Sequence, residues 1–405
     1  MLLAGLLPHP AVRDVAGAPG VGASGARLAL PAAYVALSPL TRVLDALSLL
    51  SPPQHAALAA SVLLVAVAWG RRRLGAMAAR FGVALGALAA TYLAAALLPR
   101  PAASLAVDDP SLVRVDFHTH TAASHDVPRW FDAGRRRAWE RAAGFDLAFI
   151  SDHRSFDGAA AARPANPRIA GDGIVLAPAL EGWFGGVHVV LLGVAESDRV
   201  LLGDSRLDEL LPAALASHQL AAPPVAIATI PDRVLPTLTA AARDGAPFLR
   251  AVEIADGAPR ALAQADRERA AIGGRAHALG LVPIASSNHH GWGRTAEAWT
   301  LVRVPGWRAL PADVLAARVV DVLRRGDGAA VRVVERERPT AGGVGPARGA
   351  RLAATVPMLA WQTVAALEPV ERGVWLLWIW ALVLAPVGVR GVRVRRRVRG
   401  LVVVR

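Results

Sequence analysis

Histidine and carboxylate side chains gather at the ends of predicted β-strands. His118 and His120 stand two residues apart in a strand-like run, so both imidazoles face one side of the strand and can chelate one metal ion. Glu181 ends a later strand. Further candidate ligands follow turns or end other strands: His125, His153, His188, Asn288 and His290. Several imidazoles with a carboxylate form a donor set suited to two or three divalent metal ions.

Two polar residues beside His153 have other predicted roles. Adjacent strand residues face opposite ways, so His153 is the predicted ligand and Asp152 is expected to orient a ligand. Arg154 directly follows His153 and can neutralise negative charge on a substrate, and the competing interpretation is a solvated surface arginine. The candidate catalytic residues are therefore Glu181, Asp152 and Arg154. Arg233 and Arg294 are further candidates for neutralising substrate charge.

The composition excludes several chemistries. None of the 405 residues is cysteine, which rules out thiol catalysis, disulfides, iron–sulfur clusters and Cys-ligated zinc. Lysine is also absent, which rules out Schiff-base chemistry and a carboxylated-lysine metal bridge. The prevalence of Ala, Gly, Pro, Val and Arg indicates a GC-rich genome, and we expect a bacterial source. Hydrophobic residues make up 54% of the chain and are unevenly distributed, which indicates membrane segments beside a globular part.

Three apolar runs are predicted membrane helices: 54–70, 81–98 and 373–389. At about 1.5 Å per residue, the uncharged run 81–98 nearly spans a hydrocarbon core of about 30 Å. Much of the +13 net charge lies beside these runs, in the arginines of 71–80 and 390–405. This placement favours basic flanks of membrane helices over a nucleic-acid partner. Two further runs, 28–50 and 352–367, either span the bilayer or lie in its interface.

The positive-inside rule predicts the topology. With the arginines of 71–80 in the cytoplasm, the chain leaves through 81–98 and returns through 373–389, which places the middle of the chain outside the bacterial inner membrane. The predicted division is an N-terminal, membrane-associated segment (1–53), two transmembrane helices (54–98), a globular domain (110–336), an interfacial helix with a C-terminal transmembrane helix (350–389) and an arginine-rich cytoplasmic tail (390–405).

Strand-like and helical runs alternate between 110 and 336. The predicted strands are 112–120, 146–153, 173–183, 187–194, 224–230, 251–257, 281–288, 300–304 and 330–335. The predicted helices are 133–144, 205–220, 259–280 and 311–325. This alternation predicts an α/β barrel or sheet with parallel strands, in which chemistry takes place at the carboxyl ends of the strands.

The motifs that carry the candidate ligands resemble those of the PHP (polymerase and histidinol phosphatase) domain family. They are DFHTHTAASHD (116–126), ISDH (150–153), LEGW followed by His188 (180–188) and SSNHHGWG (286–293). The resemblance covers about 112–335 and implies a distorted seven-stranded β/α barrel. It also implies one to three divalent ions, zinc or manganese, that hydrolyse a small phosphoester.

The resemblance also assigns roles to the ligands. It implies that His118 and His120 hold the first metal, with Glu181 as a bridge. His125 would lie near a third metal with His153 and His290, and His188 matches the histidine that follows the glutamate in the family.

Two positions depart from the family pattern. Ile230 stands where an Ala-His-Pro motif has its histidine, and Asn288 replaces an aspartate, so at least one metal position is expected to be weaker. Three functions follow from these observations. The leading one is a membrane-anchored phosphoesterase; the others are a PHP-like hydrolase of carboxylic or carbamate esters, and a catalytically degenerate domain that serves in binding.

Overall fold

The structure is a computed structural model that describes residues 11–15, 22–69, 73–184, 187–194, 224–229, 248–264, 266–338 and 345–401. The predicted helix 205–220, Ile230 and Arg233 lie outside these residues.

Ten of the described strands form one mixed sheet, in the order β1-β12-β11-β4-β5-β6-β7-β8-β9-β10, and β2 pairs with β3 in a separate ribbon. The strands are β1 (Val12–Asp14), β2 (Ala26–Ala29), β3 (Ser104–Val107), β4 (Leu112–Thr119), β5 (Leu147–Ile150), β6 (Val175–Phe184), β7 (Val187–Leu192), β8 (Val225–Ala228), β9 (Leu249–Ala255), β10 (Val282–Ala285), β11 (Ala298–Arg303) and β12 (Val331–Arg336).

The sheet is only partly parallel. Neighbours in the runs β4-β5-β6 and β8-β9-β10 are parallel, whereas β6-β7-β8 and β4-β11-β12-β1 are antiparallel. The expectation of a parallel sheet is therefore wrong for five of the nine strand pairings, because β7 runs antiparallel to both of its neighbours and β11 and β12 return directly beside β4. The predicted seven-stranded barrel is not confirmed.

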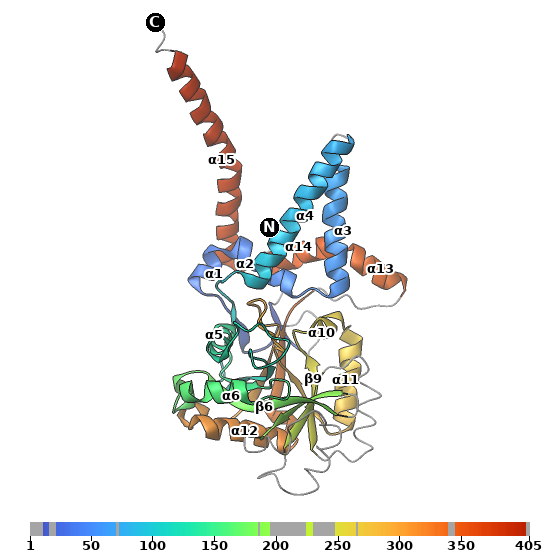
Figure 1. Cartoon of the computed structure of the whole chain (residues 1–405), viewed down its shortest axis with the longest axis vertical. Helices are drawn as coiled ribbons and strands as arrows, with labels where there is room; N and C mark the ends of the chain where they lie inside the picture. Colours follow the sequence, from blue (N-terminus) through green and yellow to red (C-terminus); the bar gives the residue numbers. More distant parts are fainter. Residues whose placement is uncertain are drawn as a thin grey trace.

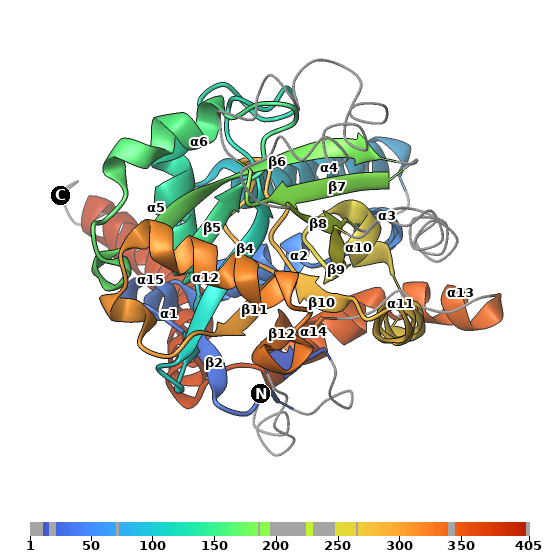
Figure 2. The same ribbon diagram turned by 90° about the horizontal axis from the view of Figure 1, so that it is seen from below.

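The sheet curls so that its β10 end approaches β11 and β4 (Figure 2). The hydroxyl of Thr300 on β11 donates to the carbonyl of Ala285 at 2.6 Å and accepts from its N–H at 2.8 Å. Beyond β10, the backbone N–H of Asn288 donates to the carbonyl of His118 at 2.8 Å. This curling brings the carboxyl ends of β4 and β10 side by side, although 170 positions of sequence separate them.

The helices are α1 (Ala32–Ala36), α2 (Ser38–Ser48), α3 (Pro52–Ala68), α4 (Leu74–Leu97), α5 (Ala133–Ala143), α6 (Asp157–Ala162), α10 (Pro259–Ala263), α11 (Asp266–Ala278), α12 (Ala312–Arg324), α13 (Pro346–Ala353), α14 (Thr355–Ala365) and α15 (Pro369–Leu401). All nine predicted strands are present to within a few residues. The short strands β1, β2 and β3 are not among the predicted ones.

Apolar alternation on β4 builds the core. Val113, Val115 and Phe117 are fully buried and belong to one cluster with Leu315 and Val319 of α12. The alternate residues of β4 point to the other face and carry the polar groups that lead into the candidate site. One face of the strand therefore packs in the core, and the other carries the candidate ligands.

Apolar helices project from one end of the globular part, and α12 lies at the opposite end (Figure 1). The predicted spans 54–70 and 81–98 largely coincide with α3 and α4, and 373–389 falls within α15. Among the described residues, only α4 is both long enough, at 24 residues, and apolar enough to cross a membrane, whereas α3 has 17 residues. Exposed Leu, Val and Trp side chains line these helices.

Candidate metal centre

Four imidazoles surround one buried carboxylate. Glu181, near the middle of β6, has its Oε2 atom 3.1 Å from Nε2 of His118, 3.3 Å from Nε2 of His120 and 3.3 Å from Nδ1 of His153. Its Oε1 atom lies 2.8 Å from Nδ1 of His188 on β7. Two trios can each hold a metal ion, His118–His120–Glu181 and His153–Glu181–His188, because within each trio the donor atoms lie within 4.8 Å of one another. The two trios share Glu181, which is the arrangement a bridging ligand needs.

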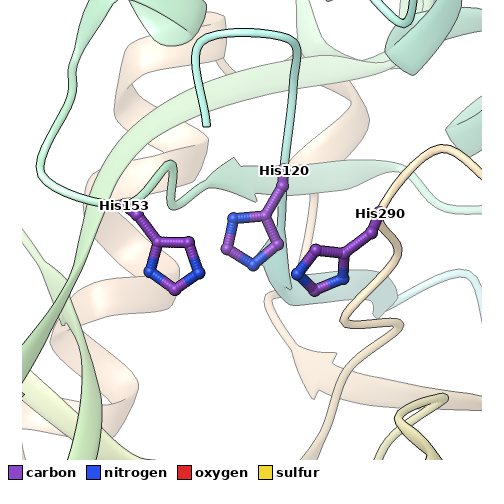
Figure 3. Close-up of side chains that lie close together, drawn as sticks. All are labelled: His120, His153 and His290. Atoms are coloured by element: carbon purple, nitrogen blue, oxygen red, sulfur yellow. The ribbon is translucent and has the colours of Figure 1, made fainter. Parts of the chain in front are cut away.

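A third trio adjoins this pair. His120, His153 and His290 come from three separate segments and their rings converge (Figure 3), with donor atoms within 4.8 Å of one another. Asp126 closes this side, because its Oδ2 atom is 3.2 Å from Nε2 of His153 and 3.0 Å from Nε2 of His290. Burial opposes ionisation of Asp126, but the hydrogen bonds from both histidines outweigh it and hold its pKa well below the ordinary value.

The histidines differ in their electrostatics. Burial disfavours the charged form of His118, yet the carboxylates of Glu181 and Glu253 outweigh it and hold the pKa of His118 well above its ordinary value. Burial holds the pKa of His120 well below its ordinary value, so this imidazole is neutral and can act as a ligand. Glu181 is also buried, but the neighbouring His118 keeps its pKa well below the usual range.

His120 provides the test of fit for a metal ion. Both of its ring nitrogens are buried and have no hydrogen-bond partner among the described residues. Leaving buried polar atoms unpaired costs about 1–3 kcal/mol each, so such atoms call for a partner. A neutral imidazole beside a carboxylate and three further imidazoles fits a divalent cation.

Two charged residues that the motifs did not flag hold the ligands in place. Glu253 on β9 is fully buried, and its Oε1 atom lies 3.0 Å from Nδ1 of His118, which fixes that ring with Nε2 toward Glu181. Arg136 on α5 is fully buried, and its guanidinium donates to the carbonyl of His120 at 2.9 Å and to the carbonyl of His289. One side chain thus ties together the segments that carry His120 and His290.

The remaining predicted residues lie around this core. Asp152 is buried and accepts hydrogen bonds from the backbone N–H and the hydroxyl of Thr121, at 2.6 and 2.7 Å, so it shapes the turn after His120. Arg154 has a left-handed backbone (φ 54°), donates its N–H to the carbonyl of Glu181 at 3.1 Å and has an exposed side chain.

Two predicted ligands lie at the edge of the cluster. The ring of His125 is exposed and 5.0 Å from that of His153, and the adjacent Asp126 takes the position between His153 and His290. Asn288 (φ 45°) donates its amide to Asp256 at 3.2 Å, and its Oδ1 atom is buried with no partner among the described residues. The ligand roles of both residues remain predictions.

The chain matches no protein-family model and no curated protein. It is similar to solved structures at low identity. PsfC from Pseudomonas syringae is 16% identical, with a TM-score of 0.37 over 64% of this chain and 100% of that chain. A proposed metal-dependent phosphoesterase from Bifidobacterium adolescentis is 15% identical, with a TM-score of 0.30 over 52% and 96%. A lesion-specific endonuclease from Pyrococcus furiosus is 12% identical, with a TM-score of 0.38 over 52% and 56%.

Proposed function

We propose that this protein is a membrane-anchored, metal-dependent hydrolase that cleaves phosphoesters. The observation that carries the proposal is the carboxylate of Glu181 within 3.3 Å of four imidazoles, with the unpaired nitrogens of His120 beside it. The order of the motifs, which resembles that of the PHP family, supports the same reaction class.

The proposed ligands form three overlapping sets. His118, His120 and Glu181 would hold one ion, and His153, Glu181 and His188 a second. His120, His153 and His290 would contribute to a third, with Asp126 beside them. Nitrogen and carboxylate donors without thiolates suit zinc or manganese. When bound, such ions supply Lewis acidity and lower the pKa of a bound water molecule.

The protein groups prepare the site for this chemistry. Glu253 holds His118 in one orientation, and Arg136 keeps the segments of His120 and His290 together. The backbone of Arg154 lies beside that of Glu181, and its exposed side chain can bind a phosphate oxygen. We therefore assign binding of the phosphate charge to Arg154 and positioning of the ligands to the buried Glu253 and Arg136.

Membrane attachment is the second part of the proposal. The length and apolar character of α4 support it, as do the exposed apolar side chains of α3 and α15. The positive-inside rule would place the arginines that follow α3 in the cytoplasm and the metal-binding domain outside. Labelling of single cysteines introduced at positions 110 and 340 with a membrane-impermeant reagent tests this orientation. If neither cysteine reacts with reagent added from outside, the proposed orientation is wrong.

The decisive experiment measures metal content and hydrolysis on the full chain in detergent. One to three divalent ions per chain by elemental mass spectrometry, reduced in His118→Ala/His120→Ala, would support the centre. Turnover of phosphomonoesters or phosphodiesters with that metal would support the reaction. Metal without turnover of phosphoesters would favour the carboxylic-ester or binding alternatives, and a chain that takes up neither zinc nor manganese would contradict the proposal.

A further inference from the structure

Two exposed tryptophans flank the opening of the candidate metal centre. Trp130 and Trp292 are 42% and 52% exposed, although they are among the largest apolar side chains in the chain. Their ring centroids are 5.9 Å apart at 88°, an edge-to-face contact. Trp130 lies four residues after Asp126, and Trp292 lies two residues after His290, so the pair belongs to the two segments that form the rim of the site.

The rim segments are packed from below, which keeps both indoles at the surface. Phe131 is buried, and its ring centroid lies 5.3 Å from that of His289. Gly291 has a left-handed backbone (φ 85°), and a Cβ atom there would come within 2.9 Å of Phe131. The chain is thus held tightly around Phe131 while the neighbouring Trp130 and Trp292 remain outside the core. Solvent exposure of such a pair is unfavourable unless something apolar covers it.

The same rim touches the end of the apolar helix α4. The N–H of Gly293 donates to the carbonyl of Ala96 in the last turn of α4 at 2.9 Å. Leu97 and Leu98 beside it are exposed. Trp292 therefore lies one residue from the point where the helix proposed to cross the membrane meets the globular part. Tryptophan prefers the interface between the hydrocarbon core and water, because its ring is apolar and its N–H is polar.

Charge on the rim matches an anionic surface. The guanidinium carbon of Arg135 lies 5.3 Å from the centroid of the Trp130 ring, and Arg129 is exposed beside the same tryptophan. The opening itself is formed by partly exposed groups: the side chains of His290, His188 and Asp126 are 29%, 33% and 35% accessible. An aromatic pair with cations between a membrane helix and an open metal centre suits a phosphate that is attached to an apolar tail.

We propose that the metal centre opens at the bilayer surface and that its substrate is the phosphoester headgroup of a membrane lipid, with Trp130 and Trp292 seated in the interface. This inference rests on the proposed hydrolase function and membrane anchoring. The acyl chains stay in the bilayer while the phosphate reaches the site between His290 and His188. Trp130 and Trp292 are specificity-determining residues here, since they contact the lipid surface and not the reacting atoms.

Hydrolysis tests the substrate class. The full chain, loaded with manganese, is reconstituted in phosphatidylcholine vesicles that contain phosphatidic acid or phosphatidylglycerol. The matched soluble substrates are glycerol phosphate and glycerophosphoglycerol, which carry the same phosphoesters without acyl chains. We expect Trp130→Ala/Trp292→Ala to lower kcat/KM for the vesicle lipid about tenfold and to change kcat/KM for the soluble ester less than about twofold. Trp361→Ala, an equally exposed tryptophan on α14, is the control and should change neither.

The outcomes separate this inference from the proposed function. Hydrolysis of soluble esters without hydrolysis of the lipids would overturn the lipid substrate and leave the hydrolase standing. An equal loss on both substrates in the double variant would also overturn it, in favour of direct stacking on a soluble substrate. Hydrolysis of neither kind of ester by the metal-loaded chain would contradict the proposed function itself.

A second readout does not depend on activity. The chain contains no cysteine, so Trp292→Cys can carry a single environment-sensitive fluorophore. In vesicles we expect a blue-shifted emission that nitroxide-labelled lipids quench. The control is Ile169→Cys, an exposed position that pairs with Pro311 beside α12 at the opposite end of the molecule (Figure 1), and should stay unquenched. Equal, water-like emission at both positions would contradict the proposed placement of the rim.

Discussion

Glu181 is the residue on which the candidate centre depends. Its two oxygens together lie within 3.3 Å of all four imidazoles of the first two trios. We expect Glu181→Gln to lower the affinity for divalent metal by more than about 100-fold, since loss of even an outer partner of a ligand costs about 10–100-fold. Glu253→Gln, which removes only the carboxylate that orients His118, should lower the affinity for divalent metal about 10–100-fold. Metal titrations measure the affinity of each variant. Equal affinities of Glu181→Gln and Glu253→Gln would contradict the bridging role of Glu181.

Asp152 gives a pH-dependent prediction at the same scale. Burial, opposed by two hydrogen bonds from Thr121, raises the pKa of Asp152 to about 6. Its charged form is therefore disfavoured in the folded chain relative to the unfolded one, where its pKa is about 3.9. The folded chain binds more protons between these values, so its stability falls as the pH rises from about 4 to about 6, and remains lowered above that.

Asp152→Asn removes this contribution. The free energy of unfolding of the unsubstituted, metal-free chain, minus that of the variant, should fall by up to about 3 kcal/mol between pH 4 and pH 6. Denaturant unfolding with a chelator present measures the difference. A difference that stays constant over this range would show that burial does not perturb the carboxyl of Asp152.

Residues in contiguous motifs could be predicted, whereas residues that act across the fold could not. The imidazoles of His118 and His120 follow from a spacing of two on one strand. Glu253 meets His118 across 135 positions, and Arg136 meets His289 across 153, so no local spacing links them. One signal was present for Glu253: it is a carboxylate within the otherwise apolar run AVEIA, and an isolated charge in a buried strand needs a partner.

The elements followed from sequence better than their pairing did. Period-two apolar runs identified the strands of the globular part, and the runs themselves do not say whether neighbours are parallel. The β6–β7 hairpin and the return of β11 and β12 beside β4 depend on long-range contacts. β1 has three residues, which is too short for a periodic pattern, yet it pairs with β12 in the main sheet.

At the scale of elements, the start of α6 packs against the turn that carries His120. A Cβ atom on Gly158 would clash with the carboxylate of Asp152 and the hydroxyl of Thr121, which bond to each other. Gly158→Ala should therefore destabilise the protein by about 1–3 kcal/mol and weaken metal binding. Gly273→Ala in α11 is the matched control, since no heavy atom lies within 4 Å of its added methyl group. This control should stabilise the chain by up to about 1 kcal/mol, and thermal unfolding compares the two.

At the scale of the whole molecule, one buried ionic cluster joins the helical end to the rim of the candidate site. Asp45 on α2 accepts from Arg100 at 2.8 Å, from Arg336 on β12 at 3.0 Å and from the hydroxyl of Thr295 at 2.9 Å. Arg100 follows α4, and Thr295 follows the segment that carries His290. A single carboxylate thus links an apolar helix, the main sheet and a candidate ligand segment.

Asp45→Asn tests how strongly this cluster holds the molecule together. The variant leaves two buried guanidiniums with no anionic partner at this position, and loss of one member of a buried ion pair costs about 3–5 kcal/mol.

The effect of Asp45→Asn depends on pH. Burial raises the pKa of Asp45, but Arg336 and Arg100 outweigh it and lower the pKa below its ordinary value. This stabilisation is therefore complete above the unfolded pKa of about 3.9 and disappears as the pH falls through the folded one. We expect a constant destabilisation between pH 5 and pH 8 that shrinks below about pH 4.

Asp108→Asn, which breaks the exposed pair with Arg27, is the control for Asp45→Asn and should lower the free energy of unfolding by less than about 1 kcal/mol. Weaker metal binding in Asp45→Asn alone would mean that the helical end sets the geometry of the rim, whereas unchanged binding would mean that the cluster only fastens the two parts together.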